Sequence, residues 1–264
     1  MKKLLVLLCA MAFLFFYGNK QAQSTLILVF DHNTDNQYAQ LALDGLGLGY
    51  VVGNDTSFNS LLTGSVWDLV VVDSPSNEPT DATGGWSPLI NHINGGGSVV
   101  MSSPHGFREL DLMLAFDMSG LGSPFYAPQD VFAWETTHPV FNSPNTVSSL
   151  SNWTDNWTQN GDRLTVNASS GAIALGGFVT TPAIGEAAIV LGNEGRTIYN
   201  GFLFDDANAP AGVSLIQNEI TYVLNMPDPD PDPGPAPVPE PATILLLGSG
   251  LVGLVRFRRK VQKG

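Results

Sequence analysis

The sequence has almost no cysteine. Its single cysteine, Cys9, lies in an apolar stretch near the N-terminus. The rest of the chain therefore offers no thiol nucleophile, no disulfide and no Cys-x-x-Cys zinc site. A chain of 264 residues can bury a sizeable core without such cross-links, so a globular domain remains the expectation.

Lysine is missing from residues 21–259, and the basic residues gather at the two ends of the chain. Between Ser24 and Pro239, three arginines stand against 23 acidic residues, which leaves this region a net charge near −20. A surface of that charge repels phosphate backbones. The composition therefore excludes nucleic acid as a partner and argues against binding to anionic membrane surfaces.

The chain also lacks an apolar run as long as the roughly 20 residues that usually span a bilayer. Near the N-terminus, two lysines precede 14 apolar residues, Leu4 to Tyr17, and small residues follow at Ala22 and Ser24. This order is typical of an export signal. We predict a signal peptide over residues 1–24 that delivers the chain to the Sec export machinery, with cleavage after Ala22 as an alternative.

The C-terminal end consists of a proline-rich, an apolar and a basic segment, in that order. Every second residue from Pro227 to Pro241 is proline, which predicts an extended linker over residues 226–239. Residues 242–255 are apolar and predict a short transmembrane helix. The basic tail, residues 256–263, would hold its end in the cytoplasm. Its first basic residues are Arg256, Arg258, Arg259 and Lys260.

Residues 238–264 resemble the PEP-CTERM sorting signal of Gram-negative bacteria. The resemblance rests on the apolar segment, the arginine cluster and a short motif, whose residues are Val238, Pro239, Glu240, Pro241, Ala242 and Thr243. It implies that an exosortase, an inner-membrane protease, processes the chain near this motif. It also implies transient anchoring in the inner membrane and later residence at the cell surface or in the extracellular matrix, where biofilm exopolysaccharide is made. An ordinary C-terminal anchor is the alternative.

Residues 25–225 alternate apolar, β-rich runs with short amphipathic segments, which is typical of a single layered α/β domain. The first half predicts buried parallel strands with helices between them, and the part after Phe116 predicts an antiparallel extension. The expected strands are 25–30, 50–52, 69–73, 98–102, 146–150, 163–166, 172–175, 187–191 and 197–202. The expected helices include 36–46, 56–62, 109–116 and 214–224, together with one that opens at Ser87 and Pro88.

This order resembles the class I glutamine amidotransferase-like fold, a flavodoxin-like layered sheet. The segments that carry the resemblance are residues 67–75, 93–103, 137–141 and 194–206. Enzymes of that family place a cysteine nucleophile on the turn after the glycine-led strand, where this chain has residues 102–106, SSPHG. Their catalytic histidine precedes proline and glutamate, whereas His138 and Pro139 precede valine. These departures predict that glutaminase activity has been lost.

An exported hydrolase is the alternative, working either from a serine in this turn or from a bound divalent metal. Ser103 follows a predicted strand, and His105 or His138 would have to act as its base, with Asp73 or Glu109 orienting that base. A nucleophilic serine needs such a base within hydrogen-bond reach and an oxyanion hole. Residues two apart in a turn seldom face each other in the required way. We therefore expect a domain that binds rather than catalyses.

Carboxylates near two strand ends suggest a cation site. Asp31, Asn33 and Asp35 form a D-x-N-x-D pattern after the first strand, but the sixth and twelfth positions lack the glycine and glutamate of an EF-hand. In an open parallel sheet, ligands bind at the carboxyl ends of the strands, and Asp73 also ends a strand. Calcium or magnesium at these four residues is one interpretation, and a solvated acidic rim with a helix cap is the other.

Tryptophans in loop-like stretches give a further hint about partners. Trp86, Trp134, Trp153 and Trp157 lie among turn residues. Aromatic faces of this kind stack on sugar rings, but they also pack beneath long loops, which we favour. Extracellular polysaccharide is the first partner expected from the sequence.

Overall fold

The computed structural model describes residues 25–31, 37–74, 78–81, 84–147, 149–150, 161–204 and 209–226. The predicted signal peptide, most of the linker and the whole sorting segment lie outside these ranges. Within them, no helix combines the length and the apolar character needed to cross a bilayer. The predicted transmembrane helix at 242–255 is among the segments not described.

The centre of the sheet consists of five parallel strands in the order β2-β1-β3-β4-β11. Four of them, β1, β3, β4 and β11, are buried almost throughout because helices cover both faces, and the first three have nearly continuous apolar sequences. The bounds are β1 Ile27–Asp31, β2 Val51–Gly53, β3 Leu69–Asp73, β4 Val99–Ser102 and β11 Thr197–Asn200.

The sheet continues beyond β11 with antiparallel strands in the order β10-β9-β6-β7. Their bounds are β10 Ala187–Gly192, β9 Ile173–Gly177, β6 Val131–Ala133 and β7 Ser149–Leu150. A separate antiparallel pair joins β5 Ser123–Phe125 to β8 Gly161–Arg163. The prediction of a parallel first half with an antiparallel extension is confirmed.

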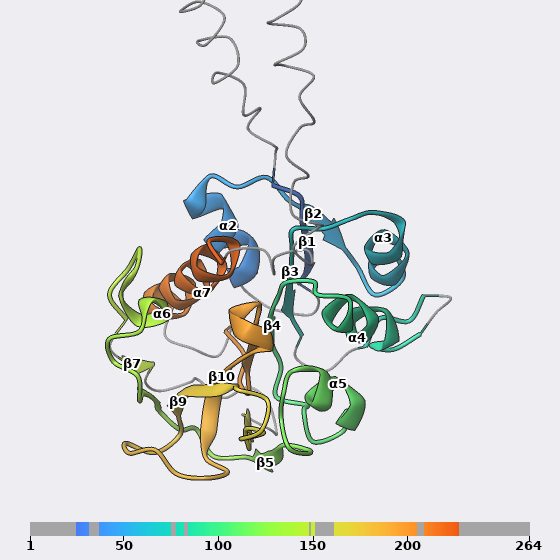
Figure 1. The fold of residues 1–264 in the computed structure, drawn as a ribbon. Helices are drawn as coiled ribbons and strands as arrows, with labels where there is room; N and C mark the ends of the chain where they lie inside the picture. The colour runs from blue at the N-terminus through green and yellow to red at the C-terminus, as the bar shows by residue number, and fades with distance from the viewer. Residues whose placement is uncertain are drawn as a thin grey trace, which may run out of the picture. The chain divides into compact units, whose positions relative to one another are not determined.

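Helices cover both faces of the parallel strands, which gives three layers (Figure 1). Alternate residues along each strand point to opposite faces. Ile27 and Val29 of β1 join the core beneath α2 and α7, whereas Leu28 and Phe30 join the core beneath α3, α4 and α5. The bounds are α2 Tyr38–Leu46, α3 Phe58–Gly64, α4 Ser87–Asn94, α5 Leu110–Ala115, α6 Pro139–Asn142, a 3-10 turn η1 Asn193–Gly195 and α7 Ala209–Leu224.

Several element boundaries differ from the sequence-based expectation, and two of these differences have a clear cause. The last helix begins at Ala209 rather than Ser214, because Pro210 occupies the first turn, where a missing N–H costs nothing. Gln217, in the middle of this helix, contacts Asn145 and the carbonyl of Ala42. The expected strand at 163–166 is also wrong, since β8 ends at Arg163 and the residues beyond it make only isolated bridges.

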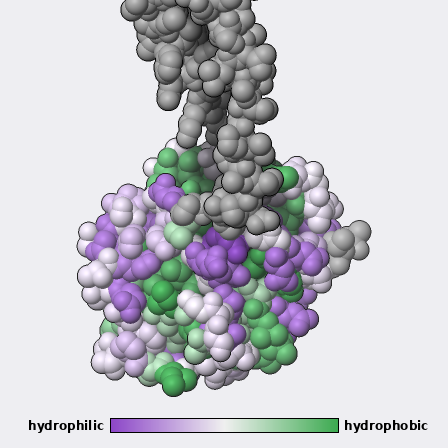
Figure 2. All heavy atoms as spheres, in the orientation of Figure 1, coloured by the Kyte–Doolittle hydropathy of each residue, from purple (hydrophilic) through white to green (hydrophobic). Residues whose placement is uncertain are grey.

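The surface in the view of Figure 2 mixes hydrophilic and hydrophobic residues without one continuous apolar patch. Scattered apolar residues of this kind are normal on the surface of a folded domain.

Candidate functional site at the carboxyl edge of the sheet

Four polar residues stand side by side where the central parallel strands end. Asp31, Asp73, Ser102 and Asn200 pair with one another in register across β1, β3, β4 and β11. Each lies two residues beyond an apolar side chain of the core beneath α2 and α7, so all four side chains face those helices. We refer to these four residues as the polar row.

Asn200 connects the polar row to a carboxyl group on α7. Its Nδ2 donates to Glu219 Oε2 at 3.0 Å and to the carbonyl of Met101 at 3.3 Å. Asn200 and Glu219 are both fully buried. Burial raises the pKa of Glu219 to about 8, because water no longer solvates its charged form. Glu219 is therefore a neutral acid at pH 7, and a neutral acid can also donate a hydrogen bond.

The sequence did not reveal Glu219, although one signal was present. Glu219 lies three residues after Ile216 and next to Ile220 on the apolar stripe of the last helix. An acid within such a stripe is buried with the rest of that face. Its partner, Asn200, is distant enough in sequence that only the fold shows the pairing.

The structure brings together two of the four residues predicted as a cation site. Asp31 and Asp73 pair in register, and Gln40 Nε2 donates to Asp31 Oδ2 at 3.3 Å. Asn33 and Asp35 lie outside the described residues. Among the residues that are described, no group of three or more histidine, cysteine, aspartate or glutamate side chains could hold a metal ion. Calcium or magnesium binding stays a prediction.

Ser103 begins the turn that follows β4, residues 103–108, which we refer to as the β4 turn. Ser103 is 5% exposed, and its Oγ accepts the backbone N–H of His105 at 3.3 Å. The Tyr199 hydroxyl donates to the Ser103 carbonyl at 3.1 Å. Ser102 faces the other side of the sheet from Ser103, towards α2 and α7. There its Oγ donates to the Phe202 carbonyl and accepts from the Phe204 N–H.

Among the hydrogen bonds of the described residues, none joins the ring of either candidate base to Ser103 Oγ. His105 contacts Ser103 through its backbone N–H, and its ring lies 5.8 Å from the ring of Phe107. His138 caps α6: its Nδ1 accepts the Val140 N–H at 3.3 Å, and its ring packs 4.8 Å from Tyr222 of α7. Burial lowers the pKa of His138. His138 is therefore held against α6 and α7 rather than against the β4 turn.

A buried aspartate that could not be found from the sequence accepts a hydrogen bond from the β4 turn. Asp162, on β8, is fully buried, and its Oδ2 accepts the Phe107 N–H at 2.8 Å. Burial raises the pKa of Asp162 to about 7, although the hydrogen bond from Phe107 opposes the shift. The partners are 55 residues apart, so no local pattern in the sequence indicated their contact.

Glu109, named above as an orienting group, instead pairs with another acid. Burial raises the pKa of Glu109 to about 7, and a hydrogen bond with Glu78 adds to that effect. Two carboxyl groups in contact hold a proton between them, because they cannot both ionise without repulsion. Glu78 is exposed, so this pair lies at the surface beside the β4 turn.

Two of the four tryptophans lie within the described residues. Trp86 is a core residue: it is 6% exposed, and the centre of its ring lies 5.8 Å from the centre of the Phe30 ring. Trp134 is partly exposed and lines a cleft in the antiparallel half. Trp153 and Trp157 lie outside the described residues. The packing interpretation therefore holds for Trp86, whereas Trp134 faces a cleft.

Comparison with known proteins bears out the sorting signal. Residues 237–260 match the family described as the PEP-CTERM protein-sorting motif. The chain carries a PEP-CTERM motif. No curated protein sequence matches the chain.

Solved structures support the fold. A Thermoplasma acidophilum protein described as part of a GMP synthase aligns with a TM-score of 0.51 at 12% identity, over 76% of this chain and 97% of that one. A ThuA-like protein from Bacteroides uniformis aligns with a TM-score of 0.51 at 12% identity, over 78% of this chain and 94% of that one. At such identities the likeness concerns the fold alone. The amidotransferase-like fold expected from the sequence is confirmed.

Proposed function

We propose that this PEP-CTERM chain is exported through the Sec machinery, processed by an exosortase and retained at the cell surface or in the extracellular matrix. The observation that carries the proposal is the PEP-CTERM motif at residues 237–260. The lysine-led apolar segment at residues 1–24 supports it, because an export signal would place the domain on the far side of the inner membrane. A Gram-negative host and a transient membrane anchor belong to the same proposal.

The α/β domain acts by binding rather than by catalysis in this proposal. Support comes from the β4 turn, where Ser103 Oγ accepts a backbone N–H and no described side chain is placed as its base. His138, the alternative base, is engaged by α6 and α7. Without a base, a serine hydroxyl is a weak nucleophile at neutral pH.

Extracellular polysaccharide is the partner that we propose for the domain. The net charge near −20 of residues 24–239 would repel a polyanionic chain. The proposal is therefore specific to uncharged polysaccharide, or to an acidic one bridged by calcium. Binding of the intact chain to a glycan array, with and without calcium, separates these two cases, and the absence of binding to every glycan would contradict the partner.

Processing can be tested with one substitution in the motif. In the native host, Glu240→Gln should leave uncleaved chain in the membrane fraction, because it removes the charged residue of the motif without changing its size. Glu194→Gln, at an exposed residue of η1, is the matched control and should be processed normally. Equal processing of both variants would contradict recognition at the motif.

An exported hydrolase is the alternative to the binding proposal, and an activity assay separates the two. If the domain only binds, the intact chain should show no turnover of ester, amide or glycoside substrates that depends on Ser103. Turnover that falls at least a hundredfold in Ser103→Ala, with unchanged thermal unfolding, would replace the binding proposal with the hydrolase.

A further inference from the structure

The antiparallel half of the domain contains a cleft that is separate from the polar row and the β4 turn. Its volume is about 460 Å³, and its walls come from β9, β10 and the segments 164–172 and 182–187. Cavities of roughly 300–1,000 Å³ accommodate small organic ligands. The cleft is therefore large enough for a molecule of one or two rings.

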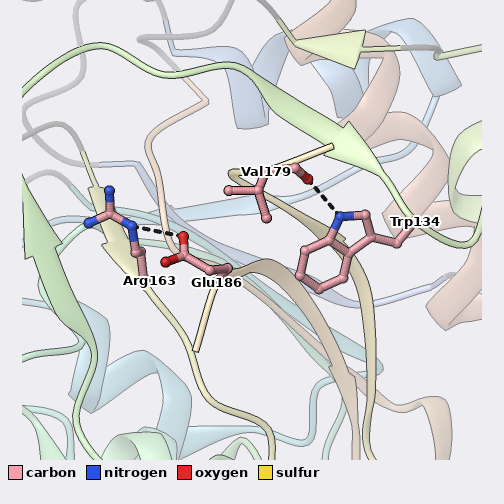
Figure 3. Close-up of polar contacts among 4 residues, drawn as sticks. All are labelled: Trp134, Arg163, Val179 and Glu186. Atoms are coloured by element: carbon pink, nitrogen blue, oxygen red, sulfur yellow. Dashed lines mark hydrogen bonds and ion pairs between the residues drawn. The ribbon is translucent and has the colours of Figure 1, made fainter. Parts of the chain in front are cut away.

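One wall of the cleft is a tryptophan held in a fixed orientation. Trp134 Nε1 donates to the Val179 carbonyl at 2.8 Å, as Figure 3 shows. Its ring lies against Gly177, where an added Cβ would be 1.9 Å from the Trp134 ring. Gly177 therefore leaves the space that the indole occupies. An aromatic surface fixed in this way costs little entropy when a ligand stacks on it.

The loop before β10 is also held in place, by an ion pair. Arg163 Nε donates to Glu186 Oε2 at 2.9 Å, and both side chains are partly exposed (Figure 3). Arg163 also lies over the ring of Phe125, 4.9 Å from its centre. These contacts tie β8 to the segment 182–187, so the cleft is bounded on this side by a restrained loop.

The lining selects the kind of ligand. Apart from Glu135 and Thr165, the described residues that line the cleft have apolar side chains or none, and none is basic. An anion would meet Glu135 and the negative field of the domain. The hydroxyl groups of a sugar would lose water and find few side-chain partners in return.

Two exposed isoleucines lie at the rim of the cleft. Ile184 is 96% exposed and Ile173 is 46% exposed, and both line the cleft. Large apolar side chains left in water beside an apolar hollow are typical of binding sites. A ligand seated on Trp134 would cover part of this surface.

We propose that this cleft binds an uncharged small molecule with a flat, apolar ring, stacked on Trp134. The proposal is independent of the polysaccharide partner, which would bind elsewhere on the domain. The ring would lie against the indole, and small side chains such as Ala172 and Ala174 would leave room for it. A single polar substituent could reach Thr165 or Glu135.

The test follows the indole N–H resonance of Trp134 in the ¹⁵N-labelled full-length chain, assigned with Trp134→Phe. 2-Naphthol serves as the neutral ring, 2-naphthalenesulfonate as the same ring with a negative charge, and a neutral oligosaccharide as the sugar arm. We expect a saturable shift with 2-naphthol, binding at least tenfold weaker for the sulfonate, and no shift with the oligosaccharide.

Variants that fill the cleft provide the matched comparison. Ala174→Phe should weaken 2-naphthol binding at least tenfold, whereas Ala127→Phe, at an exposed residue outside the lining, should bind as the wild type does. Ala172→Phe replaces Ala174→Phe if thermal unfolding shows that the latter does not fold. A Trp134 resonance that does not saturate, equal binding by the filled variant, or a shift produced by the oligosaccharide would each overturn the proposal.

Discussion

At the scale of single residues, the domain buries two carboxyl groups, and burial raises the pKa of each. Glu219 is fully buried against Asn200, and Asp162 is fully buried beneath the β4 turn. Neither arrangement could be predicted from the sequence, because each carboxyl meets a partner from a distant element. The amide Oδ1 of Asn200 finds no donor among the described residues.

The stability of the domain should therefore depend on pH through Glu219. Burial raises its pKa from 4.5 to about 8, so the folded state holds a proton that the unfolded state has lost. This contribution is complete below pH 4.5 and declines as the pH rises towards 8, by about 1.4 kcal/mol per pH unit at most. Chemical denaturation at pH 5 to 9 measures the decline.

Glu219→Gln removes that dependence, because glutamine keeps the shape and cannot ionise. We expect the variant to match the wild type within about 1 kcal/mol at pH 5 and to be more stable by several kcal/mol at pH 9. Asp162 and Glu109 change stability in the same direction, so the difference between the two proteins isolates Glu219. Parallel stability curves for both proteins would contradict a neutral Glu219.

A second residue-scale prediction concerns close backbone contact after β11. A Cβ added at Gly201 would lie 2.3 Å from the backbone oxygen of Asp162. Gly201→Ala should therefore lower the free energy of unfolding by about 1–3 kcal/mol or more. Gly49→Ala, where a Cβ would meet nothing within 4 Å, is the control. Urea denaturation measures both variants. Equal free energies of unfolding would contradict the prediction, because they would mean that the backbone moves to accept the Cβ at Gly201 without loss of stability.

At the scale of elements, the predicted and observed structures agree best for the buried parallel strands. The runs at Leu69–Asp73 and Ser98–Ser102 are continuous and apolar, and only a strand covered on both faces places such residues out of water. The short strands β5 and β8 could not be predicted from the sequence, because each has only three residues and three residues carry no clear periodicity. The row formed by Asp31, Asp73, Ser102 and Asn200 was partly expected, since parallel strands end at the same edge.

The last helix supplies an element-scale test. Ile220 of α7 is fully buried, in the core shared with α2. Ile220→Ala should lower the free energy of unfolding by about 2–5 kcal/mol, from lost burial and the cavity left behind. Thr221→Ala, at a partly exposed position of the same helix, should change it by less than about 1 kcal/mol. Similar losses in both variants would contradict the packing of α7 described here.

At the scale of the whole molecule, the chain combines a C-terminal sorting motif with an α/β domain. The fold was predictable because its pattern of strands and helices is strong, and the sorting signal because its motif is contiguous in sequence. The ligand was not predictable, because the cleft beside Trp134 is assembled from β9, β10 and loops that are distant in sequence. Export, processing and binding are therefore separate claims that can fail separately.

The central claim is that an exosortase matures this chain after export. Its most direct test is mass spectrometry of both termini of the protein recovered from its native host, with and without the exosortase gene. The account predicts a chain that starts near Thr25 and ends near residues 239–241 in the wild type, and a C-terminus retained to Gly264 when the exosortase is absent. A wild-type protein that keeps both Met1 and Gly264 would contradict it.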